Sequence, residues 1–179
     1  MRDLAALDHA FDKKTLVCRA IVETPRGARD KFDYDRETGL FRLKRTLPEG
    51  MSFPLDFGFV PSTLAEDGDP LDIMVFTETA TFPGALIDVR LIGAIEAKQT
   101  EHGKTLRNDR LLAVARVGGR YAEVKSPSDL PKQVIEQLVH FWINKDALED
   151  RLFEPLGIGE AEAAAALLRK TAKVFAKKG

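Results

Sequence analysis

Apolar and polar positions alternate over much of the first two thirds of the chain, a period typical of short β-strands. Residues 31–35 and 40–44 alternate in this way, and between them Arg36-Glu37-Thr38-Gly39 supplies a turn that ends in glycine. These segments together predict a β-hairpin. Further strands are expected at residues 16–22, 72–76, 85–97 and 110–117. Residues 98–108, which are rich in Gln, Thr, His, Gly and Lys, are expected to form an exposed loop between two strands.

A helical period replaces the alternation after Pro131. Asp129 is the expected N-cap of this helix. One face of the helix carries Val134, Leu138, Phe141 and Trp142. Two interpretations of Trp142 stay open. Its ring either caps the protein core or turns partly outward, where it would suit a subunit interface.

Residues 160–178 are rich in alanine and amphipathic, and they predict a second helix after a break at Gly157 and Gly159. One side of this helix carries Leu167, Leu168, Val174 and Phe175. Many short strands followed by two helices predict a β-rich α+β fold, in which a small barrel has the helices packed outside it. A chain of 179 residues is expected to form one such domain over its whole length.

The composition excludes several classes of function. At 44% hydrophobic and 31% charged residues, the chain resembles ordinary soluble globular proteins. A net charge of −1 provides no basic surface for nucleic acid and no cationic surface for a membrane. The single cysteine, Cys18, lies in a strand-like run and is expected to be a buried, unreactive thiol. Because the N-terminal segment lacks the apolar core of a signal peptide, a cytoplasmic protein is expected.

The most informative stretch is the acidic segment Asp67-Gly68-Asp69-Pro70-Leu71-Asp72, which runs directly into the apolar residues 73–76. Asp, Gly and Pro are common turn formers, so one interpretation is simply a turn before a strand. Three carboxylates this close also repel one another unless a cation lies among them. Asp72 stands at the start of a strand, a rigid element of the kind a metal site needs. The segment therefore indicates a divalent cation site.

Charged residues of both signs stand at the ends of predicted strands upstream of this segment. Lys31 begins the predicted hairpin and Arg45 follows its end, while Glu23 ends the first predicted strand. Each residue alone is consistent with an ordinary charged surface. Together with the acids they form the combination that binds a polyphosphate, in which metals take some oxygens and Lys or Arg neutralise the others.

At this point the sequence resembles the soluble (family I) inorganic pyrophosphatases. The resemblance is carried first by Asp67-Gly68-Asp69-Pro70-Leu71-Asp72-Ile73, which fits that family's pattern without a mismatch. It extends over about residues 17–149. Further matching segments, in the family's order, are Val22-Glu23-Thr24-Pro25, Glu37-Thr38-Gly39-Leu40, Gly58-Phe59-Val60-Pro61, Phe82-Pro83-Gly84, Leu111-Leu112-Ala113-Val114 and His140-Phe141.

The resemblance implies a five-stranded closed barrel of the oligonucleotide-binding (OB) type with flanking C-terminal helices, and a homo-oligomer, typically a hexamer. It also implies hydrolysis of pyrophosphate with Mg²⁺, although Mn²⁺ or another divalent cation is possible. Carried over to this chain, the metal ligands are Asp67, Asp72 and Glu23. By the same resemblance, Asp69 would accept the proton of the attacking water, and Lys31, Arg45, Arg110 and Lys145 would bind the phosphate oxygens.

Several positions depart from the family pattern. Gln99 and Asn108 stand where the family has acidic metal ligands, and an uncharged amide should lower metal affinity. Glu101 or Asp109 could compensate for them, depending on which way each side chain points. Phenylalanines 53 and 57 replace two tyrosines, and Asp33 replaces a glutamate. Three alternatives therefore stay open: a divergent pyrophosphatase, a binding module without activity, and a hydrolase of another phosphoanhydride with a bulkier group.

Overall fold

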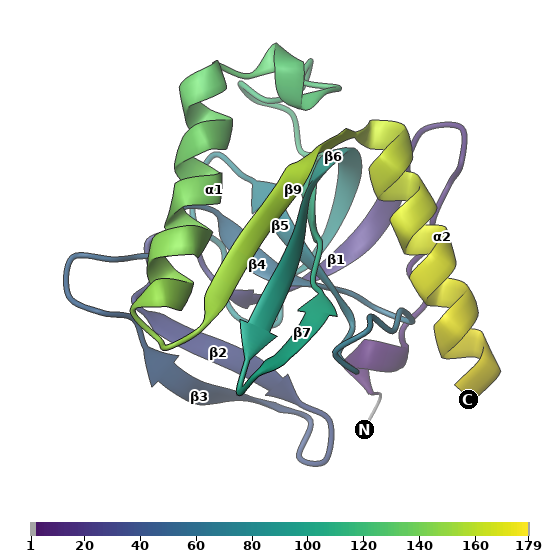
Figure 1. Cartoon of the computed structure of the whole chain (residues 1–179). Helices are drawn as coiled ribbons and strands as arrows, with labels where there is room; N and C mark the ends of the chain where they lie inside the picture. The colour runs from purple at the N-terminus through teal and green to yellow at the C-terminus, as the bar shows by residue number, and fades with distance from the viewer. Residues whose placement is uncertain (1–2, 179) are drawn as a thin grey trace.

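In a computed structural model, residues 3–178 form a β-rich molecule with a helix on either side of the central strands (Figure 1). The strands are β1 Val17–Thr24, β2 Asp30–Asp35, β3 Leu40–Thr46, β4 Asp56–Val60, β5 Leu71–Phe76, β6 Leu86–Glu101, β7 Lys104–Arg107, β8 Arg110–Ala115 and β9 Leu152–Glu160. The helices are α1 Lys132–Ala147 and α2 Ala161–Lys178, and short 3-10 turns span Leu4–Ala6 and Pro127–Asp129.

Five strands close into a ring, which confirms the predicted barrel. β1 pairs with β4 on one side and with β6 on the other, and the ring continues from β4 through β5 and β8 back to β6. Every pairing in the ring is antiparallel except that of β5 with β8. All residues of β4 and β8 are buried, as expected of strands covered on both faces. The β2–β3 hairpin is a separate sheet beside the ring, and β9 pairs with β6.

The two helices cover different parts of the core. In α1, Leu138 and Trp142 are buried against an aromatic cluster that includes Phe53, Phe57 and Phe153. Trp142 is 2% exposed, so it caps the core, and its proposed outward-facing role in an interface is wrong. In α2, the buried residues are Ala164, Ala165, Leu168 and Thr171, and the first three pack against the cluster that contains Cys18. No helix within residues 3–178 has the length and apolar character needed to cross a bilayer.

Cys18 is fully buried, and burial raises the pKa of its thiol to about 12. The predicted unreactive thiol is confirmed, because the reactive species of a cysteine is the thiolate. In α2 the predicted apolar face is only partly correct. Leu168 is buried, whereas Val174 is 37% exposed near the end of the helix.

The segment predicted as an exposed loop, residues 98–108, is instead a second hairpin. β6 continues to Glu101, and β7 returns along it after a two-residue turn. His102 and Gly103, which form this turn, have φ of 50° and 76°. Two residues with positive φ are typical of the tight turns whose twist matches paired strands. The polar composition hid the strand because both faces of this hairpin are largely solvated.

Two other sequence predictions were wrong. The glycines at 157 and 159 do not break the chain, because both lie within β9, where each pairs with a residue of β6. Asp129 does not cap α1, since Pro131 occupies the N-cap position. The Asp129 carboxylate instead accepts hydrogen bonds from the backbone N–H groups of Lys125 and Ser126 and closes the 3-10 turn before the helix.

Candidate active site

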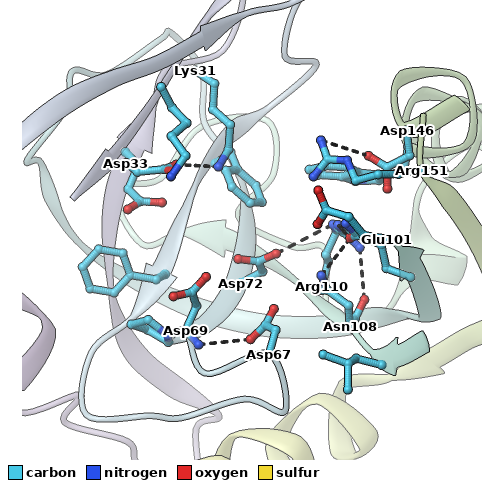
Figure 2. Close-up of a pocket in the computed structure, with 18 of the residues that line it drawn as sticks. Lys31, Asp33, Asp67, Asp69, Asp72, Glu101, Asn108, Arg110, Asp146 and Arg151 are labelled. Carbon is cyan, nitrogen blue, oxygen red and sulfur yellow. Dashed lines mark hydrogen bonds and ion pairs between the residues drawn. The ribbon is translucent and has the colours of Figure 1, made fainter. Parts of the chain in front are cut away.

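The acidic segment is both a turn and part of a cavity of about 840 Å³. Gly68 has φ of +95°, a conformation that glycine adopts without strain, and the Asp69 backbone N–H donates to Asp67 Oδ1 at 3.1 Å. Asp72 lies on β5, where it pairs with Phe59 of β4. The carboxylates of Asp67, Asp69 and Asp72 point into the same cavity (Figure 2). The structure therefore brings the predicted acids together.

Glu23 joins these acids because β1 carries a bulge near its end. Val22 and Thr24 pair with consecutive residues of β4, so Glu23 is an extra residue with no partner in the ladder. A bulge of this kind re-aims a side chain relative to the rest of its strand. The backbone N–H of Tyr34 donates to Glu23 Oε1 at 2.7 Å and anchors the carboxylate to β2. Glu23 is thereby placed in the wall of the cavity.

Lys31 and Arg45 reach the cavity from directly opposite positions of the β2–β3 hairpin. Directly opposed side chains of an antiparallel pair lie on the same face. Lys31 is ion-paired with Asp33, and Lys44 Nζ lies 3.4 Å from the other oxygen of the same carboxylate. Burial opposes ionisation of Asp33, but the two lysines outweigh it and lower the pKa of Asp33 below its usual value. The hairpin therefore contributes cations together with an ionised acid.

Burial makes the remaining acids of the cavity difficult to ionise. Burial raises the pKa of Glu23 to about 8 and the pKa of Asp72 to about 6. At Asp72, the nearby Arg110 offsets part of this effect, while Asp67 and Asp69 add to it. Burial also raises the pKa of Asp67, and the charge of Asp69 contributes to the increase. These carboxylates are therefore costly to ionise without a further cation.

A hard divalent cation fits this environment. The donors are carboxylate oxygens, the ligands that Mg²⁺ and Mn²⁺ prefer. A cation among them would stabilise the ionised carboxylates and so oppose the burial, and the smaller repulsion between acids, that raise their pKa values. Within residues 3–178, no three Asp, Glu, His or Cys side chains already converge as a closed ligand cluster. Mg²⁺ usually keeps several waters and binds through one or two carboxylates, so this spacing is compatible with it.

Arg151 stands across the cavity from the acidic segment (Figure 2), and it shares one carboxylate with two other cations that line the cavity, Arg45 and Lys145. Arg45 Nη1 and Lys145 Nζ lie 2.8 and 3.0 Å from Glu149 Oε2, and Arg151 Nη2 is ion-paired with the same oxygen. Lys145 also donates to Asp146 Oδ1 at 2.8 Å. Burial lowers the pKa of Lys145 to about 8, an effect that Asp146 opposes and the two arginines increase. We call Arg45, Lys145 and Arg151 the cationic wall.

Arg110 is placed by stacking as well as by charge. Its guanidinium carbon lies 3.8 Å from the centre of the Trp142 ring, and its Nε lies 3.8 Å from Asp72 Oδ2. Gln99 Oε1 accepts hydrogen bonds from Asn108 Nδ2 at 2.9 Å and from Arg110 Nη2 at 3.3 Å. The two amides that were expected to be weak metal ligands therefore bond to each other and to an arginine.

Of the two acids expected to compensate for these amides, only Glu101 reaches the cavity. Glu101 lies two positions from Gln99 on β6, on the same face of the strand, and it lines the cavity. Asp109 points away and is 6% exposed, with its Oδ1 accepting from the Ala97 N–H at 3.0 Å and from Arg107 Nε at 2.6 Å. The strand register decides between them, as expected.

Phe53 and Phe57 are core residues, 1% and 3% exposed. Both rings contact Trp142, with ring centres 6.3 and 5.3 Å away, so these positions contribute packing instead of hydroxyl groups. Two residues of the site, Arg151 and Glu149, were missed from the sequence. The only available signal was the density of charge at the end of α1, which an exposed helix end would also show.

The fold and the cavity together define a class: a barrel protein with a cavity in which carboxylates lie beside lysines and arginines, a combination suited to phosphate compounds. Comparison with known proteins gives the family. The family model for inorganic pyrophosphatase matches residues 20–176. The chain belongs to the inorganic pyrophosphatase family.

Individual relatives agree with this assignment. An inorganic pyrophosphatase of Halalkalibacterium halodurans is 37% identical over 152 residues, which cover 85% of this chain and 91% of that protein. The crystal structure of inorganic pyrophosphatase from Thermus thermophilus superimposes with a TM-score of 0.90 at 30% identity, covering 99% of this chain and 100% of that one. The structure of inorganic pyrophosphatase from Helicobacter pylori superimposes with a TM-score of 0.86 at 26% identity, covering 94% of this chain and 98% of that one.

Proposed function

We propose that this protein hydrolyses inorganic pyrophosphate to two phosphates with the help of a divalent cation, Mg²⁺ first among them. The observation that supports this most directly is the division of one cavity into an acidic side and a cationic side. Proteins named inorganic pyrophosphatase are similar in sequence to this chain over most of its length. Neither the fold nor the cavity favours the alternatives of an inactive binding module or of a bulkier substrate.

The proposed roles follow the two sides of the cavity. On the acidic side, Asp67, Asp72 and Glu23 would hold the cation, and Asp69 would accept the proton of the attacking water. A bound divalent cation would lower the pKa of water and neutralise phosphate oxygens. As the water oxygen bonds to one phosphorus, the bridging P–O bond breaks and the second phosphate leaves.

On the cationic side, Lys31, Arg45, Arg110 and Lys145 would bind the phosphate oxygens. Lys31 is ion-paired with Asp33, and the Nε of Arg110 lies 3.8 Å from Asp72 Oδ2. Arg45 and Lys145 stand farther along the cavity on Glu149. This spread suits a substrate with two phosphate groups, one placed near the acids and one at the cationic wall.

The test is phosphate release from pyrophosphate across a titration of Mg²⁺ and, separately, of Mn²⁺. The Asp69→Asn variant keeps the size of the side chain and removes the proton acceptor, so its turnover should fall by orders of magnitude. Asp30→Asn, on the edge of β2 and outside the cavity lining, is the matched control and should retain turnover. Absence of metal-dependent turnover in folded wild-type protein would refute the proposal.

We further propose a cytoplasmic homo-oligomer, a hexamer by resemblance to the family. Exposed apolar residues on β9, Leu156 and Ile158, are 43% and 40% exposed and are available for a contact between copies. Size-exclusion chromatography with light scattering tests the assembly. A monomer with the 19.9 kDa mass of one chain would contradict it.

A further inference from the structure

Arg151 is an unusual member of the cationic wall because it is held deeply and yet incompletely bonded. Its side chain is 9% exposed, and it lines the cavity. Arg151 Nη2 is ion-paired with Glu149 and lies 3.9 Å from Asp146 Oδ1. Its Nε is buried and finds no hydrogen-bond partner within residues 3–178. A buried, charged donor without a partner is costly, which points to a ligand that the side chain is placed to meet.

Within the cluster of ion pairs around Glu149, the cations outnumber the acids. Arg45, Lys145 and Arg151 share the two carboxylates of Glu149 and Asp146. The further acid that acts on Arg151, Glu101, itself lines the cavity. The Nε of Arg45 is also buried without a hydrogen-bond partner in the part of the chain that the structure describes. Glu149 is not among the residues that line the cavity, whereas all three cations are. The carboxylate of Glu149 therefore orients the cations from behind, and the cations themselves face the cavity.

We propose that Arg151 is a further substrate-binding residue, which binds a phosphate group together with Arg45 and Lys145 and is oriented by Glu149. The planar guanidinium offers two parallel N–H donors, a geometry that matches two oxygens of one phosphate. Phe57, which lines the same cavity, provides no hydroxyl donor, and Arg151 supplies donors from the turn after α1. The identity of the substrate rests on the proposed function, whereas the phosphate contact does not.

The test measures binding of inorganic phosphate by titration calorimetry, with and without Mg²⁺, and pyrophosphate kinetics in parallel. Arg151→Gln should weaken phosphate binding about ten- to a hundredfold, the loss expected for hydrogen bonds to a charged group. KM for pyrophosphate should rise by a similar factor, with a smaller change in kcat. Arg151→Lys, which keeps the charge but lacks the planar fork, should weaken binding severalfold. Arg120→Gln, at an exposed arginine paired with Glu78, is the matched control.

Phosphate affinity in Arg151→Gln within twofold of the wild type would overturn the proposal, even if pyrophosphate is hydrolysed. If Arg151→Gln does not fold, Arg151→Lys decides, and unchanged phosphate affinity in that variant would overturn it as well. Wild-type protein that binds no phosphate at millimolar concentration would also refute it. Loss of phosphate binding in the variant, beside a wild type that binds phosphate but hydrolyses no pyrophosphate, would support this inference and reject the proposed function alone.

Discussion

Glu23 gives the most direct test of the electrostatics of the site, because its pKa is raised to about 8 from an ordinary value of 4.5. Between these two values the folded protein keeps a proton that the unfolded chain has released. Protons bound to the native state alone make stability fall as pH rises. The contribution of Glu23 is therefore fully present below about pH 4.5 and is lost as the pH rises toward 8.

The perturbation is Glu23→Gln, which has the shape of the protonated acid and keeps an oxygen that can accept from the Tyr34 N–H. One group whose pKa is shifted changes the free energy of unfolding by at most about 1.4 kcal/mol per pH unit within its window. In metal-free protein, the stability of the wild type relative to the variant should fall with a slope approaching this limit between pH 5 and 8. Above pH 8 the variant should be the more stable of the two.

The assay is urea denaturation in a chelating buffer at four pH values between 5 and 8, followed by circular dichroism. Glu37→Gln, at an exposed acid on the tip of the β2–β3 hairpin, is the control, and its stability should depend on pH in the same way as that of the wild type. Added Mg²⁺ should reverse the trend, because a cation binds the ionised carboxylate and stabilises the folded state. Parallel pH profiles for the wild type and Glu23→Gln would refute the reasoning.

Three other changes test the core and the second hairpin. Leu138→Ala, at a position 3% exposed, should lower the free energy of unfolding by about 2–5 kcal/mol in urea denaturation. Asp109→Asn should destabilise the fold by about 1–3 kcal/mol by weakening its bond to Arg107, yet leave turnover per folded molecule unchanged. A large loss of turnover would place Asp109 in the site after all. Gln99→Asp should tighten Mn²⁺ binding severalfold in a calorimetric titration, and unchanged affinity would mean that this position does not face the cation.

The β2–β3 hairpin and the acidic segment could be predicted from the sequence because their signals are local. Alternation predicts the β2–β3 hairpin, and the acidic turn and the apolar residues that follow it lie within ten positions. The pairing of β9 with β6 is different, since it joins residues about sixty positions apart. The two glycines of β9 locally predict a break in the chain. The strand forms because the backbone of β6 offers unpaired hydrogen-bonding groups along which this segment can pair.

The sharing of Glu149 by the cationic wall, and the place of Arg151 in it, could not be predicted for a related reason. Arg45 and Glu149 are 104 positions apart, and nothing in either neighbourhood specifies the other. The same limit applies to Glu101 and Asp109, which are equally acidic in sequence. The pleat of β6 directs one toward the cavity, and the bonds to Arg107 and Ala97 hold the other away from it.

The amide pair changes the charge balance of the site in a definite direction. Carboxylates at Gln99 and Asn108 would place up to two more negative charges beside Arg110, close to Asp72, whose pKa is already raised to about 6. Without a bound cation, those charges would raise the pKa of Asp72 further. With amides in their place, Arg110 remains available to Asp72 as a permanent cation. The site is therefore closer to electrostatic balance before any metal binds, and it should need fewer bound cations to reach that balance than a site with acids at both positions.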